Sequence, residues 1–141
     1  MIGPELPEYI RTLVRGDRAA NDRIEAQLDA SGWSDFPRFL AALFFLAVDR
    51  RFGETSSHAD VIKFVAELRA DLSNGGPGIN PEAAETLISS ILDPSVDYNI
   101  EQEMVGKIQA ATVYKVLTEE DISDSDLDAF LIEAVELASR P

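Results

Sequence analysis

Pairs of glutamates three positions apart are the residues whose type and spacing could do chemistry in this sequence. In a helix, side chains at positions i and i+3 lie on one face. Carboxylate oxygens are the ligands that Mg²⁺ prefers in proteins, so such pairs on facing helices could hold a magnesium ion. The pairs are Glu5/Glu8, Glu82/Glu85 and Glu133/Glu136. Glu82 and Glu85, with Asp93 or Asp97, form the set best suited to this role.

The spacing of these pairs resembles that of all-helical nucleotide pyrophosphatases, which use Glu-x-x-Glu carboxylates. The resemblance implies a Mg²⁺-dependent nucleotide hydrolase. It covers the spacing only, because the second acidic motif of those enzymes, at a fixed distance further along, is not found in this chain. The alternative is that Glu-x-x-Glu arises by chance on the solvated faces of an acidic protein. That alternative predicts no metal and no cofactor.

Other metal and catalytic sites fit the sequence poorly. An EF-hand calcium loop needs glycine at its sixth position and glutamate at its twelfth. Counting from Asp93 gives Tyr98 and Met104, and a loop counted from Asp124 fails in the same way. His58 is the sole histidine, which excludes the paired Glu-x-x-His motifs of di-iron bundles. We therefore expect a non-catalytic protein, with His58 solvated at the start of a helix.

The net charge of −14 limits the partners of the chain. A strongly negative protein is repelled by phosphate backbones, so no binding to nucleic acid is expected. The charge is uneven: residues 70–141 hold 15 acidic and 3 basic side chains, whereas residues 1–69 hold 11 and 9. From Leu117 to Glu136 there are eight acidic residues and no basic one. This asymmetry is the most distinctive feature of the sequence.

The acidic C-terminal half predicts a docking surface for a basic protein, with electrostatic steering of the encounter. The candidate docking residues are Glu119, Glu120, Asp121, Asp124 and Asp128. Acidic residues at the start of a helix also favour its macrodipole, which accounts for Asp124 and Asp126 without a partner. Solubility alone is the competing interpretation.

Three arginines, Arg11, Arg15 and Arg18, would share one face if the first helix continued past Gly16. That face could bind a phosphate or carboxylate anion. It could also contact the acidic face of another subunit, which would make the chain a structural homo-oligomer. Solvation, or pairing with the acidic half of the same chain, is the remaining interpretation.

The run from Phe39 to Val48 contains ten apolar residues and no polar one. About 20 are needed to cross a bilayer, so no membrane span is expected. Pro37 suits a first helical turn and Gly53 a C-terminal stop, which predicts a helix over about 35–52. A helix that is apolar all round is usually buried all round. The expected inward residues are Phe39, Leu40, Leu43, Phe44, Leu46 and Val48; a ligand pocket lined by Phe44 and Phe45 is the alternative.

The sequence therefore predicts an all-α protein: one compact domain over residues 1–141, with six or seven helices around the central helix. The other helices are expected over 5–15, from Asp17 or Asn21 to 30, and over 57–72, 81–92, 97–117 and from Ser123 onward. Leu13, Ile62, Leu72 and Leu92 are among the expected inward residues. Gly106 is expected at a close helix crossing. Trp33 is expected to pack against the start of the central helix and to donate its N–H to a carbonyl. Ser57 with Asp60 predicts a weak capping box, and Asn80 followed by Pro81 predicts an N-cap and a first-turn proline. The lack of cysteine and of a signal peptide favours a cytoplasmic protein.

Overall fold

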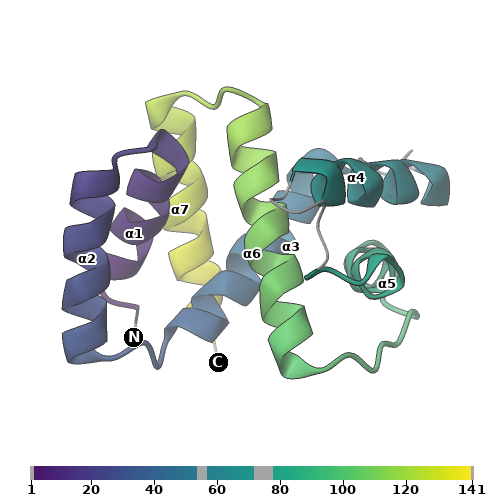
Figure 1. The fold of residues 1–141 in the computed structure, drawn as a ribbon, viewed down its shortest axis with the longest axis horizontal. Coiled ribbons are helices and arrows are strands. Elements are labelled where there is room, and N and C mark those ends of the chain that lie inside the picture. The colour runs from purple at the N-terminus through teal and green to yellow at the C-terminus, as the bar shows by residue number, and fades with distance from the viewer. Residues whose placement is uncertain (1, 54–56, 72–77, 141) are drawn as a thin grey trace. The chain divides into compact units, whose positions relative to one another are not determined.

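The computed structural model describes residues 2–53, 57–71 and 78–140, which form seven helices and no strand (Figure 1). This confirms the predicted all-α class. The helices are α1 (Glu5–Arg15), α2 (Arg18–Ser31), α3 (Phe36–Arg51), α4 (His58–Asp71), α5 (Pro81–Leu92), α6 (Gln102–Glu119) and α7 (Asp124–Ala138). None of these described helices is both long and apolar enough to cross a membrane.

The chain forms two compact units. Unit 1 comprises Met1–Leu43 and Leu117–Pro141, and unit 2 comprises Phe44–Val116. The boundaries between the units fall inside α3 and α6. The expectation that residues 1–141 form a single domain stays a prediction.

In unit 1, α1 contacts both α2 and α7 (Figure 1). Gly16 ends α1 in the left-handed conformation, with φ of 72°, and Asp17 caps α2 by accepting from the Ala20 N–H. Thr12 is buried on α1, where its Oγ1 donates to the Glu8 carbonyl at 2.9 Å and accepts from Asn21 Nδ2 at 3.0 Å. These bonds let a polar side chain occupy an inward position, whereas Leu13, predicted to lie inward, is exposed.

Three aromatic rings join the start of α3 to α1. Trp33 makes edge contacts with Tyr9 and Phe36, at ring-centroid distances of 5.2 and 5.3 Å. Its Nε1 donates to Asp29 Oδ1 at 2.7 Å. The predicted packing of Trp33 on the central helix is confirmed, but the acceptor is a carboxylate of the preceding helix and not a carbonyl.

Helix α3 supplies the largest share of buried apolar residues. They are Phe39, Leu40, Ala42, Leu43, Phe44, Ala47 and Val48. The helix is not buried all round, because Ala41, Phe45 and Asp49, spaced four apart, form an exposed stripe. Leu46, expected in the core, is only partly buried. The prediction that α3 is buried all round is therefore wrong, because an apolar sequence does not show which face of a helix meets solvent.

In unit 2, α4 contacts α5. Ser57 and Asp60 form the predicted capping box, because the Ser57 N–H donates to Asp60 Oδ2 at 2.8 Å and the Asp60 N–H to Ser57 Oγ at 3.3 Å. The buried stripe of α4 is Val61, Phe64, Val65 and Leu68. Ile62 falls one position off this stripe and is exposed, so its predicted inward placement is wrong. Leu72, predicted to continue the stripe, lies outside the described residues.

The start of α5 agrees with the prediction, whereas the start of α6 does not. Asn80 Oδ1 accepts from the Ala83 N–H at 3.0 Å, so the predicted cap and first-turn proline of α5 are confirmed. Helix α6 begins at Gln102 and not at Asp97. Four of the five intervening residues, Asp97, Tyr98, Asn99 and Ile100, have modest helix propensity. Gly106 is not at a close crossing, since an added Cβ would meet no described atom within 4 Å.

Candidate functional site

The predicted docking segment lies at the α6–α7 turn and along α7, both in unit 1. Glu119 ends α6, and Glu120, Asp121 and Ile122 lead into α7. Asp121 has φ of 50°, a left-handed conformation that a short polar residue tolerates better than most. Ser123 Oγ accepts from the Asp126 N–H at 3.1 Å, which fixes the start of α7. These local signals place the acidic residues on a defined turn and helix.

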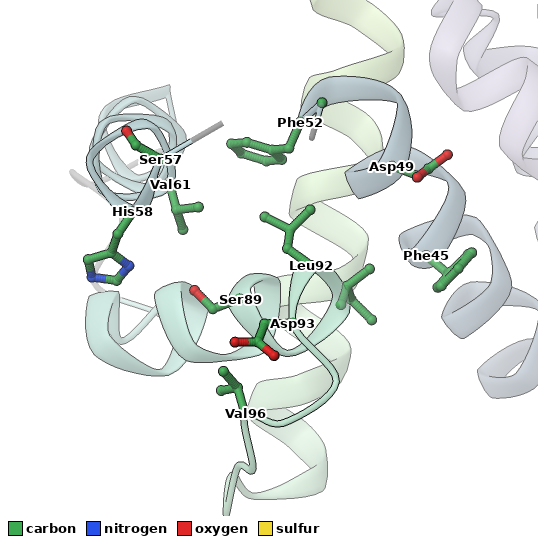
Figure 2. A pocket seen from close by; sticks show the side chains of 12 residues that line it. Phe45, Asp49, Phe52, Ser57, His58, Val61, Ser89, Leu92, Asp93 and Val96 are labelled. Atoms are coloured by element: carbon green, nitrogen blue, oxygen red, sulfur yellow. The ribbon is translucent and has the colours of Figure 1, made fainter. Parts of the chain in front are cut away.

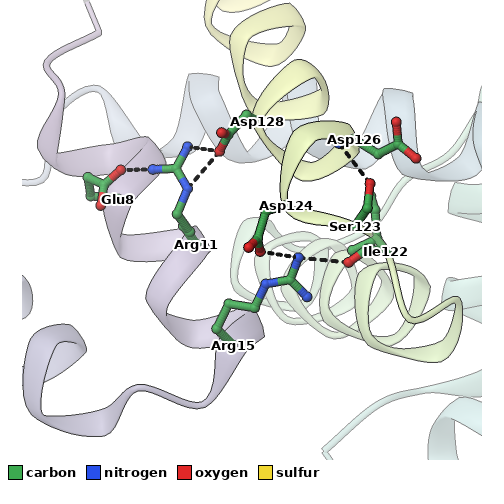
Figure 3. A network of polar contacts seen from close by, with 8 residues as sticks. All are labelled: Glu8, Arg11, Arg15, Ile122, Ser123, Asp124, Asp126 and Asp128. Atoms are coloured by element: carbon green, nitrogen blue, oxygen red, sulfur yellow. Dashed lines mark hydrogen bonds and ion pairs between the residues drawn. The ribbon is translucent and has the colours of Figure 1, made fainter.

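Arg11 on α1 holds one of the predicted docking carboxylates. Its Nε and Nη2 both donate to Asp128 Oδ1, at 2.9 and 2.5 Å, and its Nη1 pairs with Glu8 (Figure 3). Asp128 keeps about half of its side-chain surface exposed, at 51%. The guanidinium therefore lies between two carboxylates of its own chain.

Arg15 makes a second link to the same region. Its Nη2 donates to the Ile122 carbonyl at 2.7 Å and pairs with Asp124 Oδ1 at 2.9 Å (Figure 3). The Asp124 side chain is 91% exposed, so solvent screens this ion pair strongly. The hydrogen bond from Arg15 to the Ile122 carbonyl is directional, and it positions the turn that precedes α7.

Arg18 does not join this arrangement. Because α1 ends at Gly16, Arg18 is the first residue of α2 and does not extend the face formed by Arg11 and Arg15. Arg11 and Arg15 instead pair with the acidic half of their own chain. These two ion pairs require neither a bound anion nor a second subunit.

The outer face of α7 carries a feature that the sequence reasoning missed. Ile132 is 60% exposed, the highest fraction among the large apolar side chains of the described residues. At helical spacing it lies beside Ala129 and Glu136, and Glu133 and Asp126 continue the same face. All five of these residues are exposed. We call these residues, Asp126, Ala129, Ile132, Glu133 and Glu136, the α7 outer face. The available signal was that Ile132 falls outside the inward spacing of Leu127, Leu131 and Ala134.

The Glu-x-x-Glu pairs lie in three different settings. Glu8 pairs with Arg11, and Glu133 and Glu136 belong to the α7 outer face. Glu82 and Glu85 line a cavity in unit 2 together with His58, which is exposed at the start of α4. Among the described residues, no group of three or more histidine or acidic side chains is arranged to hold a metal ion. Asp93 and Asp97 therefore do not complete a cation site with Glu82 and Glu85 in this arrangement.

The two phenylalanines of the predicted pocket face different surroundings. Phe44 is fully buried, so it belongs to the core. Phe45 lies on the exposed stripe of α3 and lines a cavity of about 510 Å³ in unit 2 (Figure 2). Only Phe45 of the pair is therefore placed to meet a ligand.

Comparison of the chain with models of protein families, with curated proteins and with solved structures gives no match.

Proposed function

We propose that this chain is a non-catalytic, cytoplasmic binding module that docks a basic protein through its acidic C-terminal half. The surface comprises the α7 outer face together with Glu119, Glu120 and Asp121 at the preceding turn. The observation that carries the proposal is Ile132, which is 60% exposed and has Glu133 and Glu136 on the same helix face. An apolar centre with a polar rim is the usual anatomy of a protein interface.

Charge complementarity indicates the class of partner. The segment from Leu117 to Glu136 carries eight acidic residues and no basic one. Within this segment, Asp128 pairs with Arg11 and Asp124 pairs with Arg15. The carboxylates of the α7 outer face take no part in those two ion pairs. We expect them to attract lysine and arginine side chains of the partner. Such fields raise association rates and weaken with added salt.

The internal ion pairs also support a positioning role for two of the predicted docking residues. Asp128 and Asp124 link α7 to α1, and Arg15 additionally binds the Ile122 carbonyl. A helix that is held in this way presents its outer side chains in a fixed arrangement, which lowers the entropy lost on binding. We assign direct contact to the α7 outer face and a supporting role to Asp124 and Asp128.

The test is capture from a lysate of the organism that encodes the chain, followed by titration of the purified captured protein. The charge-reversal variant is Glu133→Lys/Glu136→Lys, and the control is Asp22→Lys/Glu25→Lys on α2, which makes the same change in net charge. We expect the first variant to weaken binding at least tenfold and the control to weaken it less than threefold. An Ile132→Ala variant is expected to weaken binding at both low and high salt.

Equal weakening by the two charge-reversal variants would assign the effect to net charge and would reject a defined surface. A captured protein whose affinity is unchanged between 50 and 300 mM salt would contradict docking through charge. Helix content measured by circular dichroism controls for unfolding in every variant.

A further inference from the structure

A cavity of about 510 Å³ lies in unit 2, lined by the end of α3, the start of α4 and the end of α5 (Figure 2). This volume is within the range of small-molecule binding sites, about 300–1,000 Å³. The cavity shares no residue with the α7 outer face, since all of its lining residues belong to unit 2.

One wall of the cavity is apolar and accessible. Phe45 and Leu92 are 44% and 39% exposed, and both line it. Phe52 and Val61, which are buried, and Val96 extend the apolar lining. Burial of this exposed apolar surface by a ligand is favourable. The cavity therefore offers an apolar body a place to bind.

The polar part of the cavity lies at the C-terminal end of α5, where Asp93 is the capping residue. The Asp93 N–H donates to the Ser89 carbonyl at 2.8 Å. Asp93 Oδ1 accepts from the Ser95 hydroxyl at 2.7 Å and from the Ser95 N–H at 3.0 Å. These hydrogen bonds lower the pKa of Asp93 below its usual value. Its second oxygen accepts no hydrogen bond from the described residues.

The electrostatics of this helix end favour a cation. The C-terminus of a helix carries partial negative charge, which a basic side chain in the last turn commonly offsets. Helix α5 has no basic residue in its last turn and carries the Asp93 carboxylate there. Ser89, four positions earlier, also lines the cavity. Asp49 adds a second carboxylate to the lining. The two carboxylates and the helix end therefore place negative charge beside the apolar wall, and α5 has no basic residue in its last turn to neutralise it.

We propose that this cavity binds a small amphiphilic amine, with its ammonium group on Asp93 and the Ser89 hydroxyl and its hydrocarbon body on Phe45 and Leu92. A primary ammonium donates three hydrogen bonds, which suits the second Asp93 oxygen and a hydroxyl. A bare metal ion suits the cavity less well, because the apolar wall supplies no ligands. An anion would meet the Asp93 carboxylate and the negative end of α5.

The experiment uses the full chain at pH 8, titrated with octylammonium, with octanoate and with ammonium chloride, and followed by methyl NMR. Octylammonium is expected to shift the methyl resonances of Val61, Leu92 and Val96 in a saturable manner and to leave those of Leu28 in unit 1 unchanged. Octanoate has the same hydrocarbon body with the opposite charge, and we expect it to bind at least fivefold more weakly. Ammonium chloride lacks the body and is expected to cause no saturable shift.

Matched variants separate the two parts of the site. Asp93→Asn keeps the oxygen that accepts from Ser95, and we expect it to weaken octylammonium binding at least fivefold. The control Glu67→Gln removes an exposed carboxylate of α4 that does not line the cavity, and we expect a change of less than twofold. Leu92→Lys is expected to abolish saturable binding, whereas Ile62→Lys, at a comparably exposed position, is expected to retain it.

Three results would overturn the proposal. Equal affinity for octanoate and octylammonium would reject the role of the carboxylate. No methyl shifts at Val61, Leu92 and Val96 up to 20 mM octylammonium would reject the cavity as the site. Tighter binding of Nα-acetyl-lysine amide than of octylammonium would replace the free amine with a lysine side chain as the occupant.

Discussion

Arg11 donates from Nε and Nη2 to one oxygen of Asp128, a residue 117 positions further along the chain. This contact connects the first and last helices of unit 1, and it uses a carboxylate from the most acidic segment of the sequence. An arginine of the first helix and the most acidic segment of the sequence therefore meet within one unit.

The Arg11–Asp128 pair should contribute modestly to stability. We expect a coupling energy of about 0.5–1 kcal/mol from a double-mutant cycle with Arg11→Ala and Asp128→Ala, because both side chains are partly exposed. Urea unfolding measures the four free energies, and the coupling should fall at 0.5 M salt. The matched cycle of Arg15 and Asp124 should give a smaller coupling, since Asp124 is 91% exposed. A larger coupling for that second pair would contradict the assignment.

Thr112 should be a site where removing a hydroxyl stabilises the protein. It is fully buried on α6, and its Oγ1 has no hydrogen-bond partner among the described residues. Thr112→Val keeps the shape and removes the unpaired polar atom, so we expect the free energy of unfolding to rise by about 1 kcal/mol. The control is Thr12→Val, which loses the bonds to the Glu8 carbonyl and Asn21 and should lower it by about 1 kcal/mol or more. Thermal and urea unfolding distinguish the two signs.

Phe64 and Phe45 should differ sharply in their effect on stability. Phe64 is fully buried and makes an edge contact with Phe52 at 5.3 Å between ring centroids. We expect Phe64→Ala to lower the free energy of unfolding by about 3–5 kcal/mol. Phe45→Ala, at an exposed position, should lower it by less than about 1 kcal/mol. Similar losses for the two variants, measured by urea unfolding, would contradict the placement of Phe45 on the exposed stripe of α3.

Tyr9 should lose its proton at unusually high pH. Burial raises the pKa of Tyr9, and the nearby carboxylates of Glu25 and Asp29 raise it further. We expect Asp29→Asn to lower this pKa in a spectrophotometric titration, with Tyr9→Phe identifying the transition and Asp22→Asn as the control. Because the folded state holds this proton more tightly, its contribution to stability is present below about pH 10, the ordinary tyrosine pKa. It should be lost as the pH rises through the pKa of Tyr9 in the folded protein.

Helix ends could be predicted from the sequence because they are set by short-range chemistry. Gly16 ends α1 in a left-handed conformation, Asn80 caps α5, and Ser123 caps α7, each as the local residues indicate. The exception is the start of α6, where Asp97 opens a nonhelical segment of five residues before Gln102. There the apolar spacing suggested a longer helix, and the weak helix propensity of the residues after Asp97 opposes it.

The exposed faces could not be predicted with the same success, because they depend on which neighbouring helices cover them. Helix α3 is apolar along the whole run from Phe39 to Val48, so its sequence contains no polar stripe to mark solvent, and Phe45 was not identified as exposed. Leu92 has core-like spacing in α5 but lies at the helix end, beside the cavity. The Arg11–Asp128 contact joins residues 117 positions apart, and the spacing of residues along the sequence does not predict which distant side chains meet.

The open surroundings of Gly106 affect how α6 exchanges its amide protons. Glycine weakens a helix by about 0.5–1 kcal/mol relative to alanine, and no described atom occupies the space that a side chain would fill. The weakness is therefore not offset by closer packing, so the first turns of α6 should open more often than the turns around the buried Val113 and Val116. Hydrogen exchange would then start at the Gln102 end of α6 and reach the opposite end last.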